Sequence, residues 1–413
     1  MNRTRPGVSI EENPASPQVI SGVQTSITAF VGRTPTGPVG TDGDGPVAVQ
    51  SFEEYERIFG GLSLESPLGY TVRDFFLNGG STALIVRLVE PGGQAASSTK
   101  DASGPKLSPQ TYIDGAIAAL DRVDLFNLLC VPPDSLDPAD TEAKRDTDNA
   151  VYQSLAVYCV KRRAMLILDA PVSWADSARR DAFNEIQPTY FGIAGETQRN
   201  AAVYFPRVVE ADILRNGAPT VMPACGAVAG IYAMTDASRG VWKAPSGTEA
   251  GISGILQLEI NLTDDQNELL NPLGINCLRS FPTYGPVVWG ARTLRGADVL
   301  EDDYKYVPIR RLWLYLEESI DRGTAWTVFE PNGEQLWAAV RISVENFLAE
   351  LQRQGAFYSF FVQCDGTTTT QEDIDQGLFN ILIGVAPLKP AEFIVIQIQK
   401  LLKGNNEDDE DKP

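Results

Sequence analysis

The sequence contains no histidine among its 413 residues, and it contains no GxxxxGK[ST] motif. Histidine is the commonest general base and the commonest protein ligand for metals. Its absence excludes a Ser-His-Asp or Cys-His nucleophile built from this chain alone. The GxxxxGK[ST] motif forms the loop that holds nucleotide phosphates in P-loop proteins, and this chain lacks it. We therefore expect no catalytic residue, no cofactor and no metal site.

Positive charge is also scarce. The chain carries 34 lysines and arginines against 54 aspartates and glutamates, a formal net charge of −20. Nucleic acids and anionic membrane surfaces are bound through basic patches, so both are poor partners for this chain. No run approaches the roughly 18 apolar residues that span a membrane, and the first residues lack an apolar signal region. We expect synthesis and folding in the cytoplasm, without direct membrane insertion.

Neither the cysteines nor the acidic loops complete the sequence pattern of a metal site. The five cysteines are odd in number and widely spaced, so we expect free, buried thiols that act as small hydrophobic side chains. One polar loop places Asp42, Asp44 and Glu53 where the first, third and twelfth ligands of an EF-hand would be. Pro46 and Val47 stand where that loop requires a ligand and its turn glycine, so a solvated turn is the better interpretation.

Residues 110–265 alternate helical patterns with short, continuous apolar strands. The strands are expected at Leu125–Val131, Ala164–Asp169 and Ala201–Val209, and a long helix is expected at Asp146–Arg163. Helices between continuous apolar strands predict a mostly parallel sheet that is covered on both faces. The fold class of this part is therefore α/β.

The last third of the chain predicts an α+β domain. One helix is expected at Pro308–Arg322, and a second carries an apolar stripe that runs from Leu336 to about Gln354. Strands are expected at Trp326–Phe329, Phe360–Cys364 and Leu378–Val385. An apolar stripe of this kind usually faces a core, which is the interpretation we adopt for the second helix.

A parallel sheet can hold a site at the carboxyl ends of its strands, and Asp134 and Asp169 lie near two such ends. A hydrolase that uses these aspartates is one hypothesis, and it predicts activity against peptides or esters. The missing histidine counts against it. Asp169 is better explained as the cap of a turn or as the partner of a neighbouring arginine.

Both ends of the chain carry strand-like arms. Near the start, Val8 and Ile10 alternate with Ser9 and Glu11, and prolines bracket the segment. Near the end, a longer apolar strand is predicted, and its residues are Phe393, Ile394, Val395, Ile396, Gln397 and Ile398. In a monomer such a strand would be an exposed edge that is prone to aggregation. Strand addition to a second chain would satisfy it, because backbone hydrogen bonds then join the subunits.

Several long motifs resemble those of contractile tail sheath proteins from phages, R-type pyocins and phage-tail-like injection systems. The matching segments are RPGVSIEE (Arg5–Glu12), NPLGIN (Asn271–Asn276), GPVVWGARTL (Gly285–Leu294), YVPIRRLWLYLEESI (Tyr306–Ile320), WTVFEPN (Trp326–Asn332) and VAPLKPAEFIVIQI (Val385–Ile398). These motifs cover both ends and most of the last third. The middle of the chain resembles the family in outline only.

The resemblance implies four regions. An N-terminal linker arm would occupy residues 1–22. An outer α/β domain would occupy residues 23–265 and would be subtilisin-like in fold but not in chemistry. An inner α+β domain would follow at residues 266–390. A C-terminal linker strand with an acidic tail would end the chain at residues 391–413.

The resemblance also implies a structural subunit and not an enzyme. Such subunits polymerise as stacked six-membered rings around an inner tube, exchange strands through their terminal arms, and contract to drive the tube through a target envelope. The implied partners are further copies of the chain, the inner tube protein, and baseplate and terminal cap proteins. The particle would be a phage tail or a phage-tail-like particle, either released or membrane-anchored.

Four arginines are candidates for contact with the tube, and the alternative is that they are ordinary solvated residues: Arg310, Arg311, Arg341 and Arg353. A sheath-like cap or baseplate component that does not polymerise alone is a second hypothesis.

Overall fold

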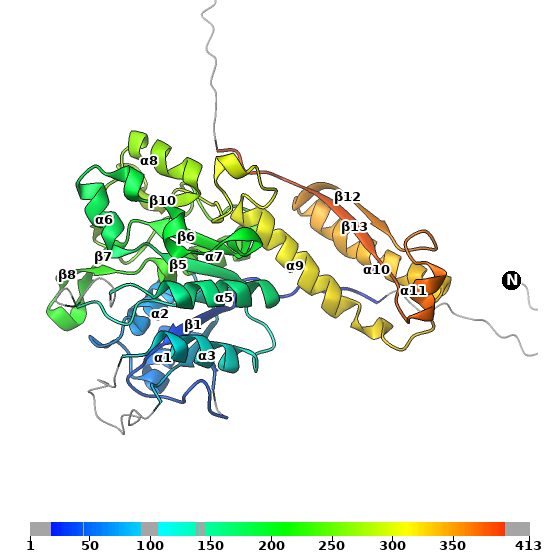
Figure 1. The fold of residues 1–413 in the computed structure, drawn as a ribbon, viewed down its shortest axis with the longest axis horizontal. Helices are drawn as coiled ribbons and strands as arrows, with labels where there is room; N and C mark the ends of the chain where they lie inside the picture. The colour runs from blue at the N-terminus through cyan, green and yellow to red at the C-terminus, as the bar shows by residue number, and fades with distance from the viewer. Residues whose placement is uncertain (1–17, 44, 92–105, 138–139, 141–144, 393–413) are drawn as a thin grey trace, which may run out of the picture.

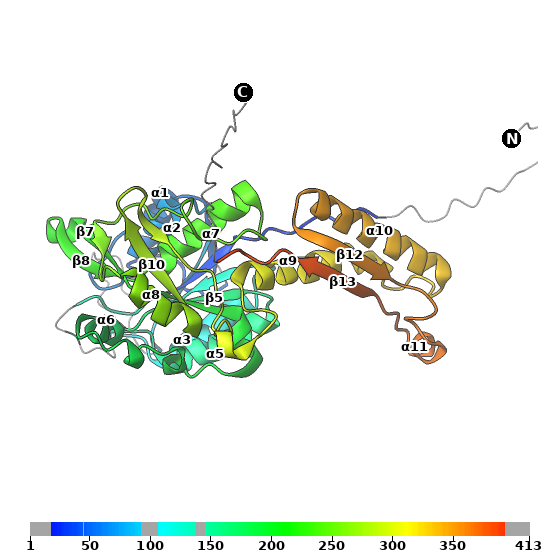
Figure 2. The same ribbon diagram turned by 90° about the horizontal axis from the view of Figure 1, so that it is seen from above.

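The computed structural model describes residues 18–43, 45–91, 106–137, 140 and 145–392. These residues form a large α/β body and a small α+β domain, and the long helix α9 (Val307–Gly323) runs from the first into the second (Figure 1). A segment near the N-terminus runs alongside the same junction, and the last described residues return from the small domain to the body (Figure 2).

The body is built on one large sheet. Within the described residues its strand order is β11-β10-β6-β5-β4-β1-β3-β2. The strands are β1 (Thr28–Gly32), β2 (Val47–Val49), β3 (Ala83–Arg87), β4 (Leu128–Cys130), β5 (Met165–Asp169), β6 (Ala201–Phe205), β10 (Ile275–Phe281) and β11 (Gly285–Val288). From β10 across the sheet to β3, each strand is parallel to its neighbour. The two edge strands, β11 and β2, are antiparallel to the strands that they pair with. The mostly parallel sheet predicted from the sequence is confirmed; the likeness to subtilisin stays a prediction.

Helices cover both faces of this sheet. One face carries α3 (Pro109–Leu120), α5 (Asn149–Lys161) and α6 (Val172–Arg179), and the other carries α1 (Phe52–Phe59), α2 (Leu68–Leu77) and α7 (Cys225–Arg239). Successive strand residues alternate between the two cores: Leu166 and Leu168 face the first, and Met165 and Ile167 face the second. Because both faces of the sheet are covered, most positions in the central strands are apolar, which is the pattern seen in the sequence; Thr28 and Asp169, at strand ends, are exceptions.

A second, smaller sheet corrects one predicted strand. The expected strand Ala201–Val209 divides at Pro206, where β6 ends, and β7 (Val208–Asp212) enters a different sheet of order β8-β7-β9. The partner strands are β8 (Ala218–Met222) and β9 (Gln257–Leu258). Proline cannot donate a hydrogen bond to a neighbouring strand, so the chain can change sheets at this residue.

The small domain packs α9 and α10 (Glu334–Arg353) against a two-stranded antiparallel sheet of β12 (Phe357–Gln363) and β13 (Leu382–Pro387), with the short helix α11 (Gln371–Asp375) between the strands. The predicted apolar stripe of α10 is confirmed as core: it comprises Leu336, Val340, Val344, Phe347, Leu348 and Leu351. The predicted strand at Trp326–Phe329 is wrong. That segment forms a 3-10 turn and a loop: the hydroxyl of Thr324 donates to the carbonyl of Ile320 at the end of α9, and the hydroxyl of Thr327 donates back to the carbonyl of Thr324.

The domain boundary also differs from the expected one at residue 266. Helix α8 (Asp264–Leu270) and strands β10 and β11 belong to the body, since Ile275–Cys277 pair in parallel with Val203–Phe205 of β6. The small domain therefore begins at α9. Short 3-10 turns complete the fold at Phe183–Glu185, Pro188–Phe191, Gly195–Asn200, Ile213–Arg215, Asn271–Leu273, Asp298–Leu300 and Ala325–Thr327.

Candidate assembly site

The β12–β13 sheet of the small domain is a surface to which a further strand could be added. Its inner face packs on α10 through Phe360, Val362, Ile383 and Val385. Within the described residues neither strand pairs with a third, so each presents an outer edge that is open to a further strand. Such edges are templates for strand addition from another chain.

The outer face of this small sheet carries two exposed apolar side chains. Phe361 is 54% exposed and Leu382 is 51% exposed. The Phe361 ring lies over Gly384, its partner on β13, where a methyl group would come within 2.0 Å of a ring carbon. Only glycine leaves room for the ring in this position. The exposed ring and Leu382 form an apolar platform beside the two open edges, and we refer to these elements together as the acceptor sheet.

The root of the N-terminal arm, residues 18–25, is held by the small domain. Ile20 is buried in the core of that domain, and its side chain fills the space beside Gly323 at the end of α9. The amide of Val23 donates to the hydroxyl of Ser319 at 3.1 Å. The guanidinium of Arg311 donates to the carbonyl of Thr25 at 2.8 Å. This segment is thus anchored on α9 before the chain enters β1 in the body.

The root of the C-terminal arm, Leu388–Glu392, is held by the body. After β13 ends at Pro387 the chain crosses back to the body, where Glu392 meets the guanidinium of Arg292. Two parallel hydrogen bonds join them, from Nε to Oε1 at 2.8 Å and from Nη2 to Oε2 at 2.6 Å. Burial alone would lower the pKa of Arg292, but the neighbouring carboxylates of Glu392 and Asp298 outweigh it and raise that pKa. The guanidinium therefore stays charged.

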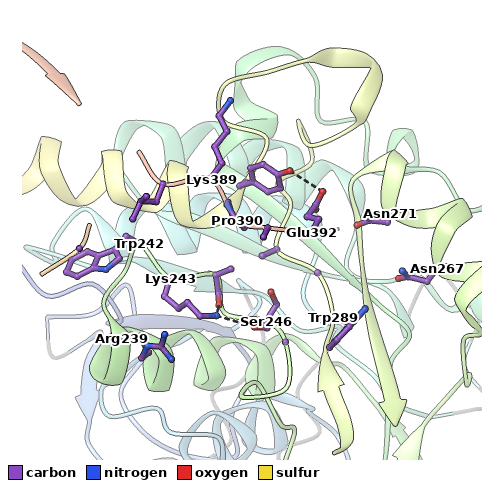
Figure 3. Close-up of a pocket in the computed structure, with 18 of the residues that line it drawn as sticks. Arg239, Trp242, Lys243, Ser246, Asn267, Asn271, Trp289, Lys389, Pro390 and Glu392 are labelled. Atoms are coloured by element: carbon purple, nitrogen blue, oxygen red, sulfur yellow. Dashed lines mark hydrogen bonds between the residues drawn. The ribbon is translucent and has the colours of Figure 1, made fainter. Parts of the chain in front are cut away.

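A cavity of about 610 Å³ lies between the body and this returning segment (Figure 3). Trp242, Lys243 and Trp289 line its body side, and Lys389 and Glu392 line the other side. Burial lowers the pKa of Lys243, whose ammonium group donates to the carbonyl of Ala244 at 3.0 Å. The cavity lies beside one of the connections between the two domains, residues 388–392, which we call the strap.

The four arginines predicted to contact a tube lie in different environments. Arg311 is buried and forms an ion pair with Asp236 at 2.6 Å, and Arg310 stacks over Tyr304 with its Nε bonded to Asn200. Arg341 donates to the carbonyl of Cys364, and the side chain of Arg353 is 74% exposed. The structure does not bring the four together. The predicted arm residues, Val8 to Glu11 and Phe393 to Ile398, lie outside the described residues.

The two aspartates at the strand ends have structural partners. Oδ1 of Asp169 accepts hydrogen bonds from the amides of Ala224 and Cys225 at 2.7 and 2.9 Å and so caps the start of α7. This agrees with the capping role expected from the sequence. Asp134 forms an ion pair with Arg33 at 2.5 Å. Burial raises the pKa of both carboxyl groups, more strongly than their partners lower it.

The five cysteines are free and buried, as expected. Burial raises the pKa of Cys277 to about 12 and that of Cys364 to about 11, so these thiols stay protonated at neutral pH. Among the described residues, no group of histidine, cysteine or acidic side chains is arranged to hold a metal ion. In the same part of the chain, no helix combines the length and the apolar character of a membrane span.

Sequence reasoning missed the pairing of Arg292 with Glu392. Both residues lie inside motifs that resemble those of sheath proteins, but they are separated by 100 positions. The available signal was an arginine inside the apolar run VVWGARTL and a glutamate directly before the apolar strand that is predicted to begin at residue 393. Opposite charges at two such apolar sites could have suggested a buried pair.

Two family models match this chain. The model described as "Phage tail sheath protein central domain" matches residues 107–294, and the model described as "Phage tail sheath C-terminal domain" matches residues 301–400. Together they span more than half of the sequence. The first ends just after β11, the last strand of the body, and the second begins just before α9.

Curated relatives and solved structures agree with these models. The tail sheath protein of Vibrio phage KVP40 is 30% identical over 42% of this chain, and that of Enterobacteria phage T4 is 24% identical over 70% of it. The matched parts are only 26% and 43% of those two proteins, so the chain spans less than half the length of either relative.

Three solved structures match along nearly the whole chain. The contracted helical sheath of the anti-feeding prophage is 28% identical with a TM-score of 0.72, and a chain of the baseplate of that particle is 28% identical with a TM-score of 0.68. Each match covers 97% of this chain and 100% of the other. The contracted sheath complex of the extracellular contractile injection system PVC is 26% identical with a TM-score of 0.70, over 97% and 98% of the two chains. The chain belongs to the family of contractile tail sheath proteins.

Proposed function

We propose that this chain is the structural subunit of a contractile sheath that polymerises around an inner tube. The observation that carries the proposal is the acceptor sheet, whose two open edges lie beside an apolar platform in a chain with a strand-like segment at each end. An acceptor on one copy and donors on another make a heterologous contact. Heterologous contacts build helical lattices instead of closed pairs.

The proposal assigns the terminal arms to strand exchange. Val8–Glu11 of one neighbour and Phe393–Ile398 of another would pair with the outer edges of β12 and β13 and turn two strands into a shared sheet. Backbone pairing would keep subunits joined while their bodies rotate, and surface that becomes buried between the bodies would supply the work of contraction. Hexameric rings, the inner tube and the baseplate are partners by analogy with sheath assemblies.

The same analogy makes the chain a non-enzymatic component of a phage tail or phage-tail-like particle. The energy for contraction would be stored at assembly, so no nucleotide site is required. Of the four arginines predicted to touch the tube, Arg353 and Arg341 remain the better candidates, since the side chains of Arg310 and Arg311 are only 12% and 3% exposed, whereas that of Arg353 is 74% exposed.

Electron microscopy of the full-length protein beside a version that lacks residues 1–17 tests this function. The truncation stops before Ile20, which belongs to the core of the small domain, so the fold should survive. Helical tubes from the full chain, lost on truncation while the melting temperature is unchanged, are the expected result. Monodisperse particles from both proteins would overturn self-polymerisation.

A cap or baseplate component is the second candidate, favoured by the match to a chain of the anti-feeding prophage baseplate. Such a component would form closed rings and no extended tubes. Mixing the protein with preformed tube protein separates the two functions: a sheath coats the tube along its length, whereas a cap or baseplate component binds only at its ends.

A further inference from the structure

Three of the motifs that resemble the sheath family meet at one point in the structure. Asn276 ends the motif NPLGIN, Arg292 lies in GPVVWGARTL, and Glu392 lies in VAPLKPAEFIVIQI. These residues come from β10, from the segment after β11, and from the strap that follows β13. Their side chains form one connected set of hydrogen bonds at the root of the C-terminal arm.

Arg292 is fully buried, and each of its side-chain nitrogens is bonded. Nε and Nη2 hold the two oxygens of Glu392. Nη1 donates to the carbonyls of Asn271 and Gly296 and to a carboxylate oxygen of Asp298, at 2.8, 3.2 and 3.0 Å. Only arginine offers this planar fork of donors, and a paired guanidinium–carboxylate contact fixes direction as well as distance.

Asn276 attaches this arginine to the large sheet. Its side-chain oxygen accepts from the amide of Arg292 at 2.6 Å, and its side-chain nitrogen donates to the carbonyls of Arg292 and Val203 at 2.7 and 3.1 Å. Asn276 is itself fully buried on β10, and Val203 lies on β6. The backbone of Arg292 is therefore tied to two strands of the body.

Glu392 also meets the start of α9. The hydroxyl of Tyr306, the residue that precedes this helix, donates to Oε2 of Glu392 at 3.1 Å (Figure 3). Lys305 lies 3.9 Å from the same carboxylate and also pairs with Asp298. The glutamate thus joins the strap to the point where the chain leaves the body for the small domain.

We propose that this cluster, which we call the arm clamp (Asn276, Arg292, Asp298, Tyr306 and Glu392), fixes the root of the C-terminal arm to the body. The inference rests on the proposed function, in which that arm joins one subunit to the next. A force on the arm is then transmitted through Glu392 to β6 and β10 of the body sheet. It therefore does not separate β13 from β12. Arg292 and Glu392 act as positioning residues for the strand-exchange contact.

The variant Glu392→Gln tests the clamp, because it keeps the size of the side chain and removes its charge. Glu53→Gln, an exposed glutamate on α1, is the matched control. Arg292→Lys keeps the positive charge and loses the fork, so its effect should be intermediate. Each full-length variant is measured twice: by amide hydrogen exchange of residues 388–392 below the concentration at which polymer forms, and by the lowest concentration that yields polymer in sedimentation.

We expect Glu392→Gln to speed exchange of the strap at least tenfold and to raise the polymerisation threshold at least tenfold, with Glu53→Gln unchanged in both. Wild-type exchange in the strap of Glu392→Gln would overturn the clamp. Fast exchange with a wild-type threshold would overturn its role in assembly. If the wild-type chain itself forms no polymer, the proposed function fails, and the assembly role fails with it. Should Glu392→Gln melt at a lower temperature than wild type, Arg292→Lys and Glu392→Asp supply the same two comparisons.

Discussion

The two arm roots are held by different physical means and by opposite domains. The N-terminal root precedes the body in sequence, yet it is anchored to the small domain by the buried side chain of Ile20 and by a hydrogen bond to Ser319. The C-terminal root follows the small domain, yet it is anchored to the body by the ion pair between Glu392 and Arg292. One anchor is mainly apolar and the other mainly ionic.

This contrast has a mechanical meaning. An apolar side chain in a core resists removal in any direction, and its contribution changes little with charge or pH. A paired guanidinium and carboxylate hold one direction and depend on both charges. We therefore expect each root to move with the domain that holds it: residues 18–25 with the small domain, and residues 388–392 with the body. The following predictions test this contrast, beginning with the largest effect.

Arg311→Met should destabilise the junction most. Arg311 pairs with Asp236 at 2.6 Å with both side chains buried, and it also holds the carbonyl of Thr25. Removing one partner leaves the other charge buried and unpaired, so we expect a loss of about 3–5 kcal/mol in the free energy of unfolding. Denaturant titration measures it. The control Arg353→Met, at an exposed arginine, should change the same quantity by less than about 0.5 kcal/mol. Equal effects of the two substitutions would contradict the structural role given to Arg311.

Ile20→Ala should weaken the N-terminal root by about 2 kcal/mol, because it removes buried methyl groups and leaves a cavity beside Gly323. Its neighbour Val19 is 88% exposed, so Val19→Ala is a matched control with little expected effect. The loss should be the same at low and high salt, since the contact is apolar. A loss for Ile20→Ala that disappears in high salt would show that the anchor is not apolar.

Tyr306→Phe should loosen the C-terminal root by about 1 kcal/mol, because it deletes a single hydrogen bond to Glu392. The measurement is amide exchange of residues 388–392, which should quicken while exchange at Ile20 stays unchanged. If both roots respond equally, the two anchors are not independent.

The smallest expected effect is that of acid, which should loosen the contacts of the C-terminal root and leave those of the N-terminal root unchanged. Burial opposes the shift, but the hydrogen bond from Lys305 and the charge of Arg292 lower the pKa of Asp298 below its ordinary value of 3.8. A lowered pKa gives stability that is present above pH 3.8 and is lost as the pH falls below it. We expect the protection of the strap amides, taken relative to the intrinsic exchange rate at each pH, to fall between pH 4 and pH 2.5, and to fall less in Asp298→Asn. An identical acid response in that variant would exclude Asp298 as its source.

Local patterns predicted the central sheet and the core helices well. Strands β4, β5 and β6 are continuous apolar runs, and the stripe from Leu336 to Leu351 repeats at helical spacing, so both were visible within a short window. The boundary at residue 266 failed because the pairing of Ile275 with Val203 joins residues 72 positions apart. Nothing local in NPLGIN distinguishes a strand of the body from a strand of the next domain.

The candidate site was predictable in kind and not in detail. Two strands of the small domain follow from local patterns, whereas the terminal arms lie outside the described residues and stay a prediction. The glycine that admits the Phe361 ring, and the arginine that holds Glu392, depend on contacts between distant segments. The exposed loop at Phe329, which was expected to be a strand, shows the same limit: a β-like composition forms no strand without a partner.

The crossed anchoring of the chain ends has a consequence for how such proteins can recombine. Residues 307–387 include the whole of the small domain's α9, α10, β12 and β13, but they exclude Ile20, which completes its core, and Arg292, which receives the strap. A genetic exchange confined to this span would transfer the small domain without Ile20 and Arg292, the residues that hold the two arm roots. Successful chimaeras between relatives should therefore co-inherit the N-terminal root and the segment that carries Arg292 with the small domain, as one linked set.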